Sequence, residues 1–360
     1  MTLVRIVQII DSLDAGGAER MAVNYANTLA GEICFSGLIA TRNEGVLKEQ
    51  IQQNVHFLCL HRKSAFDYKA IISLKKFLLV NKIDVIHAHG SSFFVGLLVK
   101  IIYFKVKLIW HDHYGDRIKN SLSNNWYIQI ASFFFDGVIA CNNELLRWAD
   151  RKLFSEHHIY LPNFTDTDKE KRESTRLKGE GGKRIVCLSN LRAPKNHKIL
   201  LEGFLESKVF KKGWSLHLVG KEVDDDYSNE VRQFIKANNL EESVFLYGVQ
   251  NDIHAILSQA SIGVLASSFE GFPVVLLEYG QAVLTVISTN VGQCPEIIVD
   301  GVNGLLFHPE QPDELASLLI RLTEDEALRI FYSSNLKSYV YENFSSQKII
   351  QKALAFYRSV

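Results

Sequence analysis

The sequence lacks an excess of charge of either sign. Its 40 Lys and Arg residues balance 40 Asp and Glu residues, and hydrophobic residues make up 47% of the 360 residues. A disordered chain has fewer apolar residues and more net charge, and a protein that binds nucleic acid through its charge has a basic excess. We therefore expect a soluble globular protein with no nucleic-acid partner.

Cysteine is scarce, odd in number and widely scattered. The five residues are Cys34, Cys59, Cys141, Cys187 and Cys294. Most of them lie in apolar runs, where a free thiol behaves as a small hydrophobe, and this favours a reducing cytoplasm. The first ten residues also lack the charged segment, long apolar core and cleavage site of a secretion signal, so we expect no such signal.

A long uncharged apolar run is missing as well. The most apolar region, Phe93–Trp110, is interrupted by Lys100, Lys105 and Lys107. A membrane-spanning helix needs about 20 predominantly apolar residues, so this region falls short. It predicts either a buried helix followed by a buried strand, with lysine stems reaching solvent, or a segment that lies against a bilayer.

Short β-rich runs alternate with helical patterns along the whole chain. The expected strands are Val4–Ile10, Val55–Leu60, Asp84–Ala88, Lys107–His111, Gly137–Cys141, Arg184–Ser189, Ser215–Gly220, Val244–Tyr247, Ile262–Ala266 and Val286–Thr289. Nearly continuous Val, Ile and Leu strands with helices between them are typical of parallel sheets covered on both faces. The pattern predicts an α/β protein with two doubly wound, Rossmann-like parallel-sheet domains.

A charged, glycine-containing stretch with almost no apolar residues, Thr165–Lys183, separates the two halves. We place an N-terminal domain at 1–165, a solvated linker at 166–183 and a C-terminal domain at 184–345. A last helix at 346–360 is expected to pack back on the N-terminal domain. Two such domains form a cleft, and open α/β sheets bind ligands beyond the carboxyl ends of their strands.

The segment Ser267–Glu278 follows an expected strand and opens a helix. Pro273 suits a first helical turn, Gly271 lets the backbone approach a ligand, and the free amides of the helix start form an anion site. Glu270 and Glu278 flank that site with carboxylates, which accept hydrogen bonds from sugar hydroxyls. The arrangement suits a ligand with phosphate in its middle and hydroxyls at both ends, and a nucleotide sugar has this layout.

The Glu-x7-Glu spacing and the Glu-Gly-Phe-Pro context of Glu270 resemble the second domain of the retaining glycosyltransferases of GT-B fold in family 4. The resemblance covers nearly the whole chain. It implies that Glu270 contacts the donor sugar and Glu278 the ribose, with Gly271, Phe272 and Pro273 also at the donor site. It further implies a nucleotide diphosphate donor, with a UDP-sugar favoured, and neither a metal ion nor another cofactor.

Two more loops carry this resemblance. Gly16 and Gly17 follow the first strand and are similar to the family's glycine loop near the donor phosphate and the acceptor, although such a pair also makes an ordinary tight turn. The segment Ser189–His197 looks like the diphosphate-binding loop, in which Lys195 matches the family lysine. A cation there would neutralise charge on the departing diphosphate.

The chain departs from the family pattern at two places. Ser189-Asn190 stands where the family has Gly-Arg, so Arg192, two residues on, is the candidate for the second cation, with a solvated basic loop as the alternative. Val283-Leu284-Thr285 stands where the family has Gly-x-Pro. This second change removes turn-forming residues but no acid, base or cation.

Two His-x-His pairs occur at the carboxyl ends of expected strands: His87 with His89, and His111 with His113. Side chains two apart on a strand point to one face, so four imidazoles could converge on a metal ion, with Asp112 or Asp116 as a further ligand. The family resemblance implies instead one active-site histidine that bonds the donor sugar or the acceptor hydroxyl. Alignment by the preceding strand places it at His113, and His111 is the alternate register.

The run Asp224–Asp226 is comparable to the metal-binding aspartates of the other large glycosyltransferase fold. It follows Gly220 and stands beside Lys221 and Glu222, which predicts a solvated loop. We expect no metal site in this chain.

The sequence therefore predicts a retaining glycosyltransferase that moves a sugar from a nucleotide diphosphate to an acceptor hydroxyl. A non-catalytic nucleotide-sugar-binding protein is the alternative, motivated by Asn190 and by residues 283–285. A Rossmann-type oxidoreductase is a third reading. Adjacent Gly16 and Gly17, in place of the spaced G-x-G-x-x-G fingerprint, argue against it.

The acceptor side of such enzymes is the first domain. Its aromatic and basic segment Phe93–Trp110, with Trp126–Ile128 and Phe133–Phe135, points to a glycan or lipid-linked glycan of surface polysaccharide synthesis, unless these aromatics are core. We expect a cytoplasmic protein at the periphery of the inner membrane face.

Overall fold

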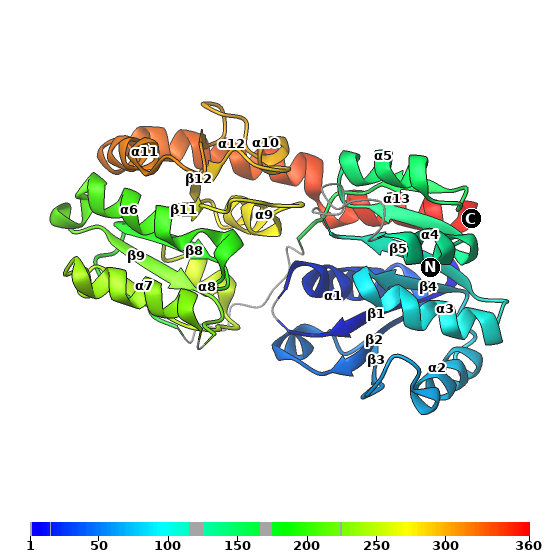
Figure 1. Ribbon diagram of the computed structural model, residues 1–360. Coiled ribbons are helices and arrows are strands. Elements are labelled where there is room, and N and C mark those ends of the chain that lie inside the picture. The colour runs from blue at the N-terminus through cyan, green and yellow to red at the C-terminus, as the bar shows by residue number, and fades with distance from the viewer. Residues whose placement is uncertain (1, 15, 115–124, 166–174, 224) are drawn as a thin grey trace. The chain divides into compact units, whose positions relative to one another are not determined.

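The computed structural model describes residues 2–14, 16–114, 125–165, 175–223 and 225–360. The chain forms two compact units (Figure 1): unit 1 comprises Met1–Asp166 and Ser345–Val360, and unit 2 comprises Thr167–Phe344. Asp116, one of the considered metal ligands, and residues 166–174 of the expected linker lie outside the described residues.

Unit 1 contains a seven-stranded parallel sheet in the order β3-β2-β1-β4-β5-β6-β7. Its strands are β1 (Thr2–Ser12), β2 (Ile33–Asn43), β3 (His56–Cys59), β4 (Val85–His89), β5 (Lys107–Asp112), β6 (Gly137–Ala140) and β7 (His158–Tyr160). Its helices are α1 (Gly17–Ala30), α2 (Tyr68–Val80), α3 (Phe93–Ile102), α4 (Trp126–Ala131), α5 (Asn143–Lys152) and α13 (Ser346–Ser359).

Helices cover both faces of this sheet. On one face α1 packs Ala22, Val23 and Ala26 against strand residues that include Ile10. On the other face, residues of α2 and α3 form a hydrophobic cluster with Val7 and Ile9 of β1. Alternate residues of β1 thus serve opposite cores, as a doubly wound sheet requires. The last helix, α13, packs against α1 (Figure 1).

Unit 2 repeats the same strand order in a six-stranded parallel sheet, β10-β9-β8-β11-β12-β13. Its strands are β8 (Arg184–Leu188), β9 (Ser215–Val219), β10 (Val244–Leu246), β11 (Ile262–Leu265), β12 (Thr285–Thr289) and β13 (Leu305–Phe307). Its helices are α6 (His197–Ser207), α7 (Asp226–Ala237), α8 (Ile253–Leu257), α9 (Val274–Gln281), α10 (Cys294–Ile297), α11 (Pro312–Glu324) and α12 (Glu326–Phe344).

Each sheet has one point at which the strand order reverses, between β1 and β4 in unit 1 and between β8 and β11 in unit 2. Open α/β sheets bind ligands at such points, beyond the carboxyl ends of the strands. These ends of the sheets carry Gly16 and His89 in unit 1 and Lys195 and Glu270 in unit 2. The predicted α/β class with two doubly wound parallel sheets is confirmed.

Three strands were not expected from the sequence: β2, β7 and β13. Strand β2 is a long inner strand whose apolar pattern is broken by Ser36, Gly37 and Thr41. Both hydroxyls have hydrogen-bond partners in other elements, since Ser36 donates to the Ala26 carbonyl and Thr41 donates to Asp11, each at 2.6 Å. Partners distant in sequence therefore make these polar residues compatible with a buried strand.

The described part of the expected linker makes hydrogen bonds to unit 2, while Arg176 and residues 178–182 are exposed. The Thr175 side chain donates to an Asp252 carboxylate oxygen at 2.8 Å, and the Leu177 amide donates to the Gln259 side chain at 3.1 Å. Leu177 is itself buried. Residues 175–183 thus belong to unit 2.

Asp225 and Asp226 are exposed, as the charge of the aspartate run predicted, but they begin a helix in place of a loop, and Asp224 lies outside the described residues. The Asp225 carboxylate accepts from the Ser228 amide at 2.9 Å and caps α7, and Asp226 is the first residue of that helix. An aspartate at a helix start satisfies free amides and complements the helix dipole, so local structure accounts for both residues.

The apolar region Phe93–Trp110 forms α3 and β5, as the buried interpretation predicted, but its helix end is not buried. Ile101, Ile102 and Phe104 are exposed. The nearby aromatics divide in the same way, since Trp126, Tyr127, Phe133 and Phe134 are exposed whereas Ile128 and Phe135 are core residues. Across the described ranges, none of the helices is both long enough and apolar enough to cross a membrane.

Candidate active site

In unit 2 the loop after β8 presents Lys195 at the switch point. A short 3-10 helix, Ala193–Lys195, is followed by Asn196 in the left-handed conformation at φ 55°, which asparagine tolerates better than most residues. The Asn196 side chain donates to the Pro309 carbonyl at 2.9 Å and holds this turn. The chain then enters α6, and Lys195 is left half-buried at the loop's edge.

The loop after β11 brings Glu270 to the same place. The Lys195 Nζ atom lies 2.5 Å from Glu270 Oε1, and Ser267 Oγ donates to that same oxygen at 2.6 Å. The Ser268 amide donates to the Pro194 carbonyl at 2.9 Å, which joins the two loops through their backbones. The Lys195 and Glu270 side chains are only 18% and 10% exposed, so their charges interact in a poorly solvated place.

A third loop packs against the backbone of Glu270. Gly292 has φ 51°, and a Cβ atom built on it would lie 1.8 Å from the Glu270 carbonyl oxygen. Only glycine avoids both the left-handed strain and this collision. The loop that joins β12 to α10 therefore fixes the backbone of Glu270, a role that the sequence analysis did not identify.

Helix α9 begins one residue later than expected. Pro273 is its N-cap residue, and no side chain caps the helix start within the described part of the chain. The first amides of a helix have no partner from a preceding helical turn, and such a helix start favours an anion. Glu278 lies half-buried just over one turn into α9. Phe272 is 7% exposed and its ring packs against Phe344, 5.6 Å between centroids, so its side chain serves the core.

Ser189 and Asn190, which stand where the family has Gly-Arg, both have hydrogen-bond partners in unit 2. Ser189 Oγ lies 3.0 Å from His197 Nε2, and the Asn190 side chain accepts from the Lys221 amide at 2.8 Å. Arg192, the candidate second cation, is exposed on the same loop, directly before the 3-10 helix that carries Lys195. The structure thus brings Lys195 and Glu270 together and leaves Arg192 at the surface.

The two buried cysteines of unit 2 near these loops are not poised as nucleophiles. Burial raises the pKa of the Cys187 thiol to about 11 and that of the Cys294 thiol to about 12. Both thiols therefore stay protonated at neutral pH, and the thiolate is the reactive form. Cys294 is fully buried and begins α10.

In unit 1 the glycine loop after β1 opens α1. Gly16 is its N-cap residue with extended backbone, and a Cβ atom there would lie 2.2 Å from the Glu19 carboxylate. Gly17 has no atom within 4 Å of such a position, so that side of the loop is open to a ligand. Leu13 precedes this loop and packs closely against Gly45, since a Cβ atom built on Gly45 would lie 2.3 Å from the Leu13 carbonyl.

Asp11, at the end of β1, connects the loops of unit 1. Its carboxylate accepts from Thr41, from Ser91 and from Arg62, at 2.6, 2.6 and 3.2 Å. The Arg62 side chain is only 4% exposed. The sequence reading missed this centre, although an aspartate directly after a buried strand was the available signal.

The four histidines converge. His89 lies opposite His111 in the register of β4 and β5. His87 Nε2 lies 3.1 Å from His111 Nδ1, and His89 Nδ1 lies 2.9 Å from His113 Nε2. The outer nitrogens have further partners: His87 Nδ1 is 2.8 Å from the Tyr357 hydroxyl of α13, and His89 Nε2 is 2.9 Å from Gln8 Oε1. We call these four residues the histidine cluster.

Burial keeps the histidine cluster neutral. It lowers the pKa values of His87, His89 and His111 well below 6.5, and that of His113 to about 3. The nitrogen atoms of His87, His89 and His111 are near enough for a common metal ion. Such an ion would have to replace the hydrogen bonds just described, because both ring nitrogens of His87 and of His89 are already engaged.

Two sheets of equal strand order, each with polar side chains at its switch point, define the GT-B class of proteins. Residues 168–339 match the family model for glycosyl transferases group 1, and residues 15–169 match that for glycosyltransferase family 4. The N-acetyl-alpha-D-glucosaminyl L-malate synthase of Bacillus anthracis is 30% identical over 290 residues, 77% of this chain and 75% of that protein. The chain belongs to the group 1 glycosyltransferases of GT-B fold.

Other relatives extend over more of the chain. The UDP-Gal:alpha-D-GlcNAc-diphosphoundecaprenol alpha-1,3-galactosyltransferase of Escherichia coli is 24% identical over 370 residues, 95% of this chain and 93% of that protein. The crystal structure of HepE from Anabaena in complex with UDP-glucose has a TM-score of 0.82 at 19% identity and covers 99% of this chain and 100% of its own. At this identity the structural likeness shows the fold alone.

Proposed function

We propose that this glycosyltransferase moves a sugar from a nucleotide diphosphate, with a UDP-sugar favoured, to an acceptor hydroxyl with retention of configuration. The observation that carries the proposal is the contact of Lys195 with Glu270 beside the uncapped start of α9. A cation and helix amides suit a diphosphate, and a carboxylate next to them suits sugar hydroxyls. The Escherichia coli relative is named for a UDP-Gal donor, and HepE was solved with UDP-glucose, and both agree with this donor class.

Donor binding in unit 2 replaces the contact between Lys195 and Glu270 with contacts from each residue to the donor. Without ligand the Lys195 ammonium is neutralised by Glu270. A bound diphosphate offers Lys195 a second anion and frees Glu270 to accept from a sugar hydroxyl. Arg192 and the amides at Gly271 add positive charge, and Glu278 accepts from the ribose. These groups stabilise the charge that develops on the leaving phosphate.

The bond changes balance without a protein nucleophile. The bond from the anomeric carbon to the diphosphate oxygen breaks, and a bond from that carbon to the acceptor oxygen forms on the same face. The acceptor proton passes to the departing phosphate. His113 in unit 1 orients the sugar or the acceptor hydroxyl, and Gly16 and Gly17 leave room for the donor phosphate and the acceptor. Phe272 and Pro273 contribute only their backbone at the start of α9.

Metal independence is part of the proposal, because amides and basic side chains already face the diphosphate. Transfer should therefore persist in excess chelator. A loss of transfer that added Mg²⁺ or Mn²⁺ restores would contradict this part alone.

The direct experiment is a thermal-shift screen across UDP-, GDP-, ADP- and CMP-linked sugars, followed by transfer assays with the donor that stabilises. A ligand at about 100 times its dissociation constant adds roughly 2.7 kcal/mol to the stability of the folded state. We expect one nucleotide class to raise the melting temperature of the wild type and not of Lys195→Ala. Stabilisation without transfer to any glycan or lipid-linked acceptor would favour a non-catalytic sugar-nucleotide-binding protein.

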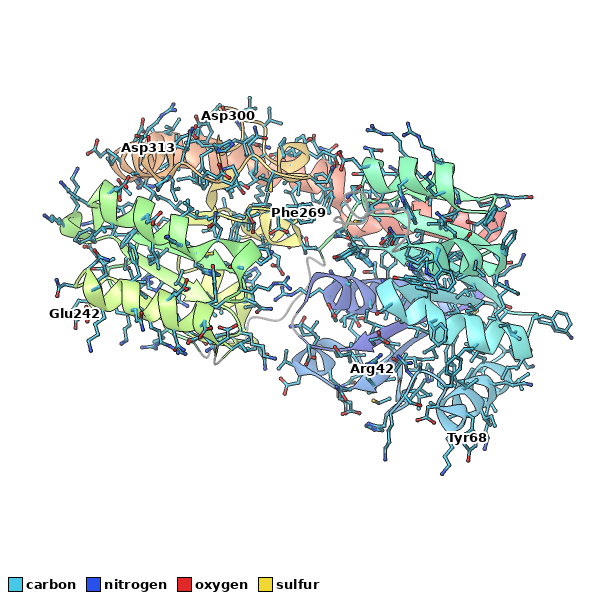
Figure 2. All side chains as sticks on the ribbon, viewed as in Figure 1. Arg42, Tyr68, Glu242, Phe269, Asp300 and Asp313 are labelled. Carbon is cyan, nitrogen blue, oxygen red and sulfur yellow. The ribbon has the colours of Figure 1, made fainter. Side chains whose placement is uncertain are left out.

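We also propose peripheral contact with the inner membrane face, where a lipid-linked acceptor would be found. The packed helices α2 and α3 expose Tyr68, Ile72, Leu79, Val80, Ile101 and Ile102, with Lys69 and Lys76, and the segments that follow these helices expose Lys82, Phe104, Lys105 and Lys107. We call this set the α2–α3 surface, and Tyr68 projects outward from it (Figure 2). Residues 68–111 contain 7 lysines and one acidic residue, Asp84. Apolar side chains among uncompensated lysines suit an anionic bilayer.

A further inference from the structure

The histidine cluster is connected to the C-terminal helix by a chain of hydrogen bonds. Tyr357 is 4% exposed, and its hydroxyl lies 2.8 Å from His87 Nδ1. His87 in turn lies 3.1 Å from His111. The rings of His87 and His111 stack with 5.1 Å between centroids and 12° between planes. Tyr357 comes from α13, the segment that follows unit 2 in the chain and completes unit 1.

The direction of this chain follows from counting protons. A neutral imidazole carries one N–H and one lone pair. If Tyr357 donates to His87 Nδ1, then His87 Nε2 carries the proton and donates to His111 Nδ1. In the opposite direction His111 would donate to His87, and His87 to the phenol oxygen, but a phenol O–H is a more acidic donor than an imidazole N–H, and an imidazole nitrogen is a better acceptor than a phenol oxygen. Donation from Tyr357 is therefore the favoured direction.

The consequence lies at the far end, on His111. Its Nδ1 accepts, so its Nε2 carries a proton. That Nε2 atom is buried and has no hydrogen-bond partner among the described residues. The neighbouring His113 Nδ1 atom is likewise buried and unpartnered, and the two rings stack at 3.9 Å between centroids. Buried polar atoms without partners are rare, and two on adjacent rings mark a place where a polar group of a ligand or a water belongs.

We propose that Tyr357 is a positioning residue, which acts through His87 to fix the tautomer of His111, so that His111 presents an N–H donor to an oxygen atom of the bound sugar or acceptor. The part that concerns transfer rests on the proposed function. The part that concerns the tautomer does not. The C-terminal helix thereby contributes to the chemistry of the site as well as to the packing of unit 1.

The matched variants are Tyr357→Phe and Tyr25→Phe. Tyr25 is also fully buried and its ring packs edge-on against His87, 4.9 Å between centroids, but its hydroxyl has no partner among the described residues. Each variant deletes one buried hydroxyl beside the same histidine. Only Tyr357→Phe removes a donor to an imidazole, so a packing role would affect both alike.

The first readout is the imidazole nitrogen chemical shifts of protein labelled with ¹⁵N-histidine at pH 7. For the wild type and Tyr25→Phe we expect His87 and His111 as single tautomers protonated at Nε2. For Tyr357→Phe we expect intermediate shifts at His111, which indicate a mixture. Protonation of His111 at Nδ1 in the wild type, or identical His111 shifts in all three proteins, would overturn the proposal whether or not the protein transfers a sugar.

The second readout is kinetic. We expect Tyr357→Phe to lower kcat/KM about tenfold while Tyr25→Phe leaves it within twofold, both measured well below the melting temperature of each variant. In a His111→Gln background Tyr357→Phe should have no further effect, because its action passes through His111. An equal loss in both backgrounds would show that Tyr357 acts by another route. Inactivity of the wild type toward every donor would contradict the proposed function and leave the tautomer result standing.

Discussion

The ammonium of Lys195 lies 2.5 Å from a carboxylate oxygen of Glu270, across 75 residues of sequence. Each residue follows a different strand of unit 2, β8 and β11, and these strands are neighbours at the switch point. The pair is the meeting point of two predicted motifs, the family's basic loop and its Glu-x7-Glu segment. Its geometry makes the basic residue and the acid interdependent, so substitutions at one should alter the effect of substitutions at the other.

Lys195→Ala should reduce kcat/KM for the sugar donor by about 10- to 150-fold, which corresponds to the loss of one charge-assisted hydrogen bond of about 1.5–3 kcal/mol. The double variant Lys195→Ala/Glu270→Gln should lose less than the product of the two single effects, because each single change leaves the other group without its partner. Steady-state kinetics on the four proteins measure this coupling.

The matched control is Lys198→Ala. This lysine lies three residues further along, in α6, and its side chain is 71% exposed with only a long contact to Glu202. Its removal should leave kcat/KM within twofold, since an exposed pair contributes little. Wild-type kinetics in Lys195→Ala, Glu270→Gln and Glu278→Gln alike would eliminate the proposed donor site.

Gly292→Ala should both destabilise unit 2 and impair donor binding. Left-handed backbone costs a non-glycine residue about 1–2 kcal/mol, and the collision with the Glu270 carbonyl adds to it. Gly301→Ala is the control for the first effect alone, because Gly301 has φ 69° but open space at its Cβ position. Urea unfolding should show a smaller loss for Gly301→Ala, with donor affinity unchanged. Equal effects of the two substitutions would mean that Gly292 does not support Glu270.

Motifs that lie within one loop were readable from the sequence, and contacts between distant segments were not. The loops of Lys195 and Glu270 follow strongly apolar strands, so their place at the sheet edge could be predicted. The close approach of Gly292 to the Glu270 backbone depends on the packing of a third loop. The role of Tyr357 depends on where α13 packs in unit 1. Neither leaves a pattern in sequence. Strand β2 was missed for the related reason that Ser36 and Thr41 find their partners in other elements.

The histidine cluster should make stability fall as the pH is lowered. Burial lowers the pKa of folded His113 to about 3 from its ordinary value of 6.5. Between these values the unfolded chain binds a proton that the folded one does not, so stability is fully present above pH 6.5 and decreases toward pH 3. Each such histidine contributes a slope of about 1.4 kcal/mol per pH unit within its window.

His113→Asn should therefore reduce the slope of unfolding free energy against pH between 6 and 4, as measured by urea titration at fixed pH values. The exposed His157, changed to Asn, serves as the control and should leave the slope as it is. Identical slopes for the wild type and His113→Asn would indicate that this imidazole becomes protonated in the folded state.

The α2–α3 surface should bind vesicles that contain anionic lipid, and not purely zwitterionic ones. Each lysine near an anionic bilayer contributes about 1 kcal/mol, so Lys69→Gln/Lys76→Gln should weaken binding roughly 30-fold. Lys198→Gln/Lys236→Gln removes the same charge from exposed positions of unit 2 and should bind as the wild type does. Co-sedimentation at low and high salt separates the contribution of the lysine charges from that of the apolar contact. Salt screens the lysines and leaves the contact of Tyr68 and Phe104 with the bilayer. Equal losses in the two double variants would mean that net charge, and not this surface, determines vesicle binding.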